Sequence, residues 1–299
     1  MSAGAMPPSV LGAVLGAALL HAGWNALLKH REVDANNDAS TDSNADSNAG
    51  DPLVATLLVV AGAAGCAAIL LPFLDAPSPA SWPFIAASSV LQCAYYLLLA
   101  ATYRAGDVSH AYPLMRGSAP LLVAFVNGPL TGERLDGAQW LATGLICGGV
   151  LAMWLGARGR GRATGLALLT ACVIAAYTLV DGAGVRRSGA PAAYTLWIFL
   201  CTGLAVWLLA ARRRLPALLA QARARPLVAP LGGLASLASY GIALWAMTRA
   251  PVAAVAALRE TSILFATAIA AFVLRERVGR ARVAAACLIA CGAAAMRLG

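Results

Sequence analysis

Residues 252–274 read VAAVAALRETSILFATAIAAFVL, an apolar run of helix length with Arg259 and Glu260 near its middle. Residues 108–130 read VSHAYPLMRGSAPLLVAFVNGPL and place Arg116 at the corresponding point. A helix of about 20 apolar residues crosses the hydrocarbon core of a bilayer. A charged side chain inside it costs roughly 2.5 to 3.5 kcal/mol on insertion scales and usually faces a cavity or a partner. The two runs therefore predict two membrane helices whose arginines flank a central cavity.

The whole chain has the composition of an integral membrane protein. Of its 299 residues, 60% are hydrophobic and only 12% are charged, whereas roughly a quarter of the residues in a soluble protein are charged. The apolar runs are rich in Ala, Leu and Gly and lack the alternation of a membrane β-strand. We expect an all-α integral membrane protein with ten transmembrane helices. The expected spans are residues 9–28, 52–74, 83–102, 108–130, 137–156, 163–180, 192–211, 228–248, 252–274 and 283–298.

The two opening runs belong to an internal repeat of about half the chain. Arg116 corresponds to Arg259, 143 residues later, and Glu133 corresponds to Glu276 at the same offset. Upstream, Trp24 and Asn25 align less closely with Tyr177 and Thr178. Each repeat holds five helices, an odd number, so the second copy enters the membrane from the opposite face. Such inverted repeats recur in secondary transporters, with the substrate near the midplane between them.

The expected division is a first five-helix repeat at residues 1–156 and a second at residues 157–299. Within the first, residues 31–51 are rich in Asn, Asp, Ser and Ala and contain no aromatic side chain. A segment of that composition cannot bury a core. We expect residues 31–51 to form a disordered loop.

The charges of the chain indicate topology and not a nucleic-acid partner. The net charge is +9, but the arginines lie in short gaps between spans and do not form a basic stripe with interleaved aromatic residues. Fifteen of the 22 Lys and Arg lie in the loops that follow the odd-numbered spans. The positive-inside rule places those loops in the cytoplasm and both termini outside.

Residues 21–29, HAGWNALLK, and the turn Gly132-Glu133-Arg134 resemble the EamA-type members of the drug/metabolite transporter superfamily. The resemblance implies two five-helix repeats, a multi-pass protein of the cell (inner) membrane, and export or exchange of small metabolites. It also implies cytoplasmic termini, the reverse of the charge-based orientation, so the orientation stays open. One departure from the family pattern is Arg275, which stands where Gly usually precedes the residue equivalent to Glu276.

Arg116 and Arg259 are the first candidates for substrate binding, because a guanidinium group offers a planar fork to carboxylate or phosphate oxygens. In the competing interpretation, one arginine pairs with Glu260 and fixes packing only. His21, Trp24 and Asn25 share one face of the first helix and are expected to line the cavity, with an interhelical hydrogen-bond seam as the alternative.

Aromatic side chains complete the expected site. Tyr95 and Tyr240 occupy repeat-related positions well inside their spans, and Tyr96 and Tyr177 accompany them. They suit a ligand of mixed polarity, although tyrosines also anchor membrane interfaces. The expected substrate-binding set is His21, Trp24, Asn25, Tyr95, Tyr96, Arg116, Tyr177, Tyr240, Arg259 and Glu260.

Candidates for proton coupling are His21, His110, Asp181 and Glu260, since histidine titrates near physiological pH and carboxylates inside membranes form proton relays. For Asp181, which is followed by Gly182 and two arginines, a solvated turn is the competing interpretation.

These patterns predict a secondary transporter of an amino-acid-like or organic-anion solute, by alternating access of two inverted repeats. Efflux of drugs or cationic amphiphiles is the alternative, and a membrane-embedded enzyme or sensor is a more distant one. No catalytic order and no phosphate-cradling motif is present, so we expect no enzyme, cofactor or metal. The expected partners are a small solute and membrane lipid, with the oligomeric state open and a monomer acceptable.

Overall fold

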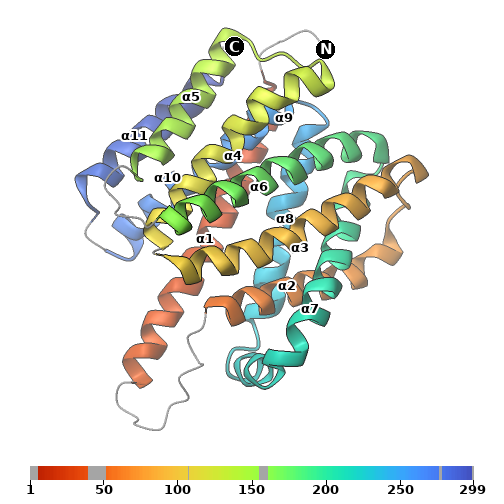
Figure 1. Ribbon diagram of the computed structural model, residues 1–299, viewed down its shortest axis with the longest axis vertical. Helices are drawn as coiled ribbons and strands as arrows, with labels where there is room; N and C mark the ends of the chain where they lie inside the picture. The colour runs from red at the N-terminus through yellow and green to blue at the C-terminus, as the bar shows by residue number, and fades with distance from the viewer. Residues whose placement is uncertain (1–5, 40–51, 107, 155–160, 276–277, 298–299) are drawn as a thin grey trace.

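The computed structural model describes residues 6–39, 52–106, 108–154, 161–275 and 278–297. In these ranges all regular structure is helical (Figure 1), which confirms the all-α class. The α-helices are α1 (Pro8–Ala39), α2 (Pro52–Leu70), α3 (Trp82–Ala105), α4 (Val108–Thr131), α5 (Gly137–Ala152), α6 (Gly161–Ser188), α7 (Pro191–Ala224), α8 (Val228–Met247), α9 (Val252–Arg259), α10 (Thr261–Ala268) and α11 (Arg280–Ala295). Short helical turns are η1 (Leu71–Phe73), η2 (Pro79–Ser81) and η3 (Ile269–Val273), the last of them π-helical.

The helices are those of a multi-pass membrane protein. Among the described residues, seven segments are long and apolar enough to span a bilayer, and α5 is a shorter apolar helix. Large apolar side chains such as Phe73 and Phe272 are 80% and 84% exposed, as expected of side chains that face lipid. The total of ten spans stays a prediction.

The expected span at residues 252–274 is found as one apolar segment, Val252–Val273, but its helix is interrupted. It breaks at Glu260 into α9 and α10. The Glu260 amide donates to the Ala257 carbonyl at 3.0 Å, three residues back, and the Thr261 hydroxyl donates to the Leu258 carbonyl at 2.7 Å. This tightened turn changes the direction in which Glu260 points relative to a continuous helix.

The expected disordered loop is also wrong in its first part. Helix α1 continues to Ala39, so residues 31–39 are helical, and residues 40–51 lie outside the described residues. Leu, Lys, Arg and Glu at the end of the apolar run are good helix formers, and an established helix extends one residue at a time at little cost.

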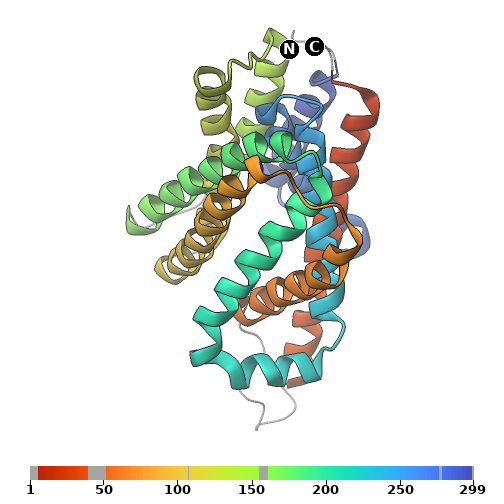
Figure 2. The ribbon, with the colours of Figure 1, turned by 90° about the vertical axis from the view of Figure 1, so that its right-hand side faces the viewer.

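Most of the helix contacts join a helix from the first half of the sequence to one from the second half. Helix α5 packs against α11, α2 against α7 and α8, α3 against α6 and α7, α4 against α6 and α9, and α1 against α8, α9 and α10. Figure 2 shows α7 bending sharply toward its end, and Pro216 lies inside this helix. A proline removes a helical hydrogen bond and kinks the helix.

Glycines set the closest helix contacts. A Cβ atom at Gly149 of α5 would lie 2.9 Å from the Ala285 carbonyl oxygen of α11, and one at Gly292 of α11 would lie 2.8 Å from the Ala142 carbonyl oxygen of α5. Small residues allow membrane helices this backbone approach. The α5–α11 contact therefore depends on glycine on both sides.

A test of such packing is available where α2 meets α8. A Cβ at Gly62 would lie 1.8 Å from the Ala229 carbonyl oxygen, whereas one at Gly65, one turn later, would meet nothing within 4 Å. Gly62→Ala is expected to lower the unfolding free energy by about 2 kcal/mol, because overpacking forces the backbone apart. Gly65→Ala is expected to raise it by about 0.5 kcal/mol through helix propensity. Thermal unfolding in detergent measures both, and equal shifts would contradict the close α2–α8 contact.

Candidate functional site

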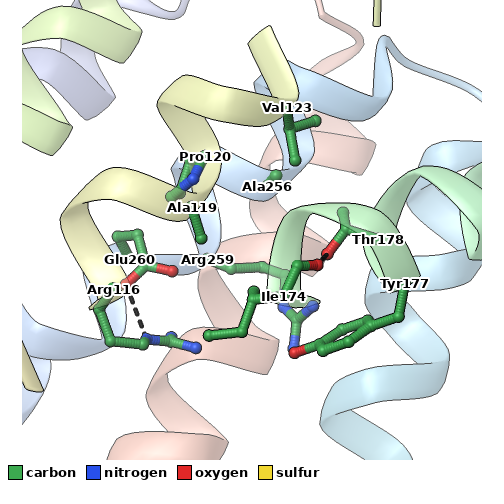
Figure 3. Close-up of a pocket in the computed structure, with 10 residues that line it drawn as sticks. All are labelled: Arg116, Ala119, Pro120, Val123, Ile174, Tyr177, Thr178, Ala256, Arg259 and Glu260. Carbon is green, nitrogen blue, oxygen red and sulfur yellow. Dashed lines mark hydrogen bonds and ion pairs between the residues drawn. The ribbon is translucent and has the colours of Figure 1, made fainter. Parts of the chain in front are cut away.

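A pocket lies where α4, α6 and α9 meet (Figure 3). Its empty volume is about 340 Å³, including space open to solvent, but only about 20 Å³ admits the centre of a water molecule. That is room for about one water molecule, so the pocket is narrow. It is lined by Arg116, Ala119, Pro120, Val123, Ile174, Tyr177, Thr178, Ala256, Arg259 and Glu260.

Arg116 and Glu260 form an ion pair inside the pocket. The Arg116 Nε atom lies 2.9 Å from the Glu260 Oε2 atom, and their side chains are only 19% and 5% exposed. The break between α9 and α10 carries Glu260, and α4 carries Arg116. On α4, Pro120 has no N–H to donate to the carbonyl of Arg116 four residues earlier, so polar backbone accompanies the charged pair at this point of the helix.

Arg259 lies in the same pocket without a carboxylate partner among the described residues. Its guanidinium carbon stands 4.8 Å from the centre of the Tyr240 ring, a cation–π distance. Figure 3 shows the guanidinium groups of Arg116 and Arg259 on either side of Ile174. The pocket thus holds two arginines, one neutralised by Glu260 and one resting on an aromatic face.

Further predicted residues surround this pair. The charges of Arg116 and Arg259 both act on the His21 ring of α1. Tyr177 lines the pocket, and its ring meets Tyr95 of α3 edge-on with centroids 6.0 Å apart. The Tyr96 ring in turn lies 5.2 Å from Tyr95. Tyrosines from two helices therefore form one wall beside the arginines.

Two first-helix candidates lie apart from the pocket lining. Trp24 packs against α8, where a Cβ at Gly232 would lie 2.1 Å from the indole, and its Nε1 atom is buried with no hydrogen-bond partner in the described part of the chain. Asn25 is exposed, and its amide donates to the His21 carbonyl of its own helix at 2.8 Å. The structure thus brings His21, but not Asn25, toward the arginines.

The four proton-coupling candidates are not together. His110 is buried on α4, within hydrogen-bond distance of Thr164 (2.9 Å) and of the Trp154 indole (3.3 Å). Asp181 is fully buried on α6, so the solvated-turn interpretation is wrong. Helix α6 continues to Ser188 because Arg186 donates to the Met247 and Ala250 carbonyls and holds its last turns against the end of α8.

Sequence reasoning missed two kinds of residue. The first is Thr178, which lines the pocket and whose hydroxyl donates to the Ile174 carbonyl at 2.7 Å; its alignment with Asn25 in the repeat was a usable signal. The second is Glu133, which binds Arg186 at 2.5 Å and accepts a hydrogen bond from the Val252 amide at 3.2 Å. Nothing in its Gly-Glu-Arg turn indicates those distant partners.

Among the residues described, no group of three His, Cys, Asp or Glu side chains could hold a metal ion. The chemistry that the pocket offers is charge recognition by guanidinium, carboxylate and aromatic groups.

Comparisons with known proteins address the fold and the family. The sequence model of the EamA-like transporter family matches residues 162–298. A solved structure titled "Crystal structure of protein" is 19% identical, with a TM-score of 0.65, and the match covers 97% of this chain and 98% of that one. At that identity the likeness concerns the fold alone. No curated protein matches the chain.

Proposed function

The chain carries an EamA-like transporter domain at residues 162–298, and from this premise we propose that it moves a small amino-acid-like or organic-anion solute by alternating access. The resemblance seen in the sequence is confirmed for that domain. The family implies secondary transport and not an enzymatic reaction. The cell (inner) membrane is the proposed location, with export or exchange as the proposed direction.

The proposed architecture is ten spans in two inverted repeats, residues 1–156 and 157–299. At the α5–α11 contact, Gly149 meets Ala285 and Ile289, while Gly292 meets Ala142 and Ile146. Each residue of the first set lies 143 positions from its mate in the second, which is the exchange that a two-fold axis produces.

The helix pairs support the same symmetry. Exchanging the repeats turns the α3–α6 contact into α8–α1, and the α3–α7 contact into α8–α2, and all four contacts exist. Helix α1 begins and α11 ends at the same end of the molecule (Figures 1 and 2). An even number of spans requires that arrangement.

The observation that carries the proposed substrate class is the pair of repeat-related arginines in one pocket. Arg259 offers its guanidinium without a carboxylate partner among the described residues, and Arg116 is held by Glu260. Guanidinium groups in a site of low dielectric bind carboxylate and phosphate oxygens strongly and with defined geometry. Neutral aromatic walls from Tyr177 and Tyr95 suit the organic part of such a solute.

The narrow pocket fits a state of the transport cycle in which no solute is bound. With room for about one water molecule, it must widen before a metabolite can enter. A solute anion would then compete with Glu260 for Arg116. We infer that separation of this pair accompanies binding.

Efflux of cationic amphiphiles is the second candidate, and one observation favours it. Glu260 is buried, and the pocket beside it has a tyrosine wall, a combination that attracts organic cations. In that case Arg116 would be displaced from Glu260 by the cation.

A thermal-shift screen of the purified protein separates these candidates. A ligand that binds the folded state raises its apparent stability by mass action. We expect stabilisation by L-glutamate, succinate or aminophosphonates, loss of that effect in Arg259→Gln, and its retention in Arg249→Gln, whose arginine lies 4.8 Å from the Trp245 ring outside the pocket. Stabilisation by tetraphenylphosphonium alone would replace the anion proposal by the cation one.

A further inference from the structure

Asp181 is a buried acid that the pocket itself does not use. Its side chain is fully buried on α6, in a segment that can span the membrane. In the described part of the chain it has no ion pair. An acid in such a place is costly and in membrane proteins marks an ion or proton pathway.

Hydroxyl groups from three other helices converge on this carboxyl group. The Tyr240 hydroxyl of α8 donates to Oδ2 at 2.5 Å, and the Tyr194 hydroxyl of α7 donates to Oδ1 at 3.3 Å. The Ser88 hydroxyl of α3 completes the set. A hydroxyl can donate to a carboxylate or accept from a carboxylic acid, so this shell satisfies both protonation states without moving the backbone.

Tyr240 connects Asp181 to the pocket. Its hydroxyl binds Asp181, and its ring carries the Arg259 guanidinium at 4.8 Å. The Arg259 charge also acts directly on Asp181. Among the described residues, the other ionisable groups that act on it are Tyr177 of α6 itself, Tyr194 and Tyr240, while Arg116 of α4 is engaged by Glu260.

We propose that Asp181 is the proton-binding residue of the transport cycle, and that its proton is taken up together with an anionic solute at Arg259. The inference rests on the proposed function. With the pocket empty, the Arg259 charge stabilises the Asp181 carboxylate. A bound anion neutralises the Arg259 charge, and one proton then converts the Asp181 carboxylate into the neutral acid. The proton and a singly charged solute anion add no net charge per bound pair.

Linkage makes this coupling reciprocal, so protonation of Asp181 also strengthens anion binding. The other candidates fit the role less well. Glu260 has a direct cationic partner in Arg116, His21 already lies within the influence of the Arg116 and Arg259 charges, and His110 is held between Thr164 and Trp154.

The deciding experiment is an infrared titration of the full-length protein in nanodiscs without added solute. The carboxylic-acid band that grows as the pH falls is expected to lose one component in Asp181→Asn. That component is expected to titrate at a different pH in Arg259→Gln, because the positive charge that acts on Asp181 is removed. Arg249→Gln is the control and should leave it in place. Identical spectra for the wild type and Asp181→Asn, or no effect of Arg259→Gln, would overturn the inference.

A flux assay separates this inference from the proposed function. In proteoliposomes with radiolabelled L-glutamate as the probe, the wild type is expected to exchange the probe and to accumulate it on the side toward which an imposed proton gradient drives protons. Asp181→Asn should keep exchange and lose accumulation at least tenfold. Retained accumulation in Asp181→Asn would overturn the proton role. Absence of exchange by the wild type would instead contradict the proposed function for this class of solute and leave the titration to decide the proton site.

Discussion

Arg116→Gln is expected to lower the unfolding free energy by about 3 kcal/mol, the order measured when one partner of a buried ion pair is removed. The destabilisation comes from Glu260, which loses its cationic partner. Glu260 is 5% exposed and its ion-pairing partner among the described residues is Arg116. Without that partner it stays buried as an uncompensated charge or takes up a proton, and either change destabilises the fold.

The double variant Arg116→Gln, Glu260→Gln is expected to recover most of that loss, since it removes both charges and leaves two polar side chains that can hydrogen-bond. Unfolding in detergent for the wild type, the two single variants and the double variant gives a double-mutant cycle. Arg249→Gln is the control, with an expected change within about 0.5 kcal/mol for an exposed side chain. Additive losses in the double variant would show that Arg116 and Glu260 are not coupled.

The same variants separate stability from recognition. The double variant should regain stability but still fail to be stabilised by L-glutamate or succinate, because Arg116 is missing from the pocket. Recovery of anion binding with stability would show that Arg116 serves packing alone, which was the competing interpretation of this residue.

The sequence was sufficient to predict the arginine pair because two regularities agree there. The apolar runs fix the depth of Arg116 and Arg259 in their helices, and the repeat relates the two positions. The structure places both in one pocket with Tyr177 and Glu260. The all-α class follows from the same runs.

The partner of Glu260 could not be predicted in this way. Glu260 follows Arg259 in the sequence, but adjacent residues on a helix point in different directions and do not face each other. The turn at Glu260 and the packing of α4 on α9 decide that it meets Arg116 instead. Such a choice depends on a contact between residues 144 positions apart in sequence, which a single sequence does not encode locally.

For Asp181, the local sequence suggests an exposed side chain, whereas the side chain is buried. Gly182 and two arginines downstream are typical of a solvated turn, yet each has a different role in the fold. Gly182 leaves room for Val252, whose side chain would lie 2.6 Å from a Cβ there, and Arg186 binds backbone carbonyls at the end of α8. The local composition suggests exposure because the residues that cover this segment belong to α8 and α9, which are distant in the sequence.

The second large effect concerns a set of contacts that we call the latch, formed by Asn127, Glu133, Arg186 and the Val252 amide. Glu133 accepts from Asn127 at 2.7 Å and from Val252 at 3.2 Å, and it pairs with Arg186. Arg186 also donates to Met247 and Ala250. The latch joins the turn after α4 to the ends of α6 and α8 and to the start of α9, so it ties the first 156 residues to the rest.

In an alternating-access cycle, contacts between the proposed repeats at one end must separate when the pocket opens there. Arg186→Gln is expected to raise amide hydrogen exchange in residues 247–252 by about tenfold or more, since a hydrogen bond to a charged group contributes roughly 1.5 to 3 kcal/mol. Glu133→Gln should have a similar effect. The two together should not be additive, because both break the same latch.

Arg187→Gln provides a matched control one residue away. Its guanidinium donates to the Ala183 carbonyl of its own helix at 2.8 Å and lies 4.9 Å from the Phe84 ring, so it does not touch α8 or α9 through these contacts. Its exchange in residues 247–252 should match the wild type. If Arg186→Gln and Arg187→Gln raised exchange equally, the effect would come from the lost surface charge, and Glu133 and Arg186 would have no role in holding this end of the molecule closed.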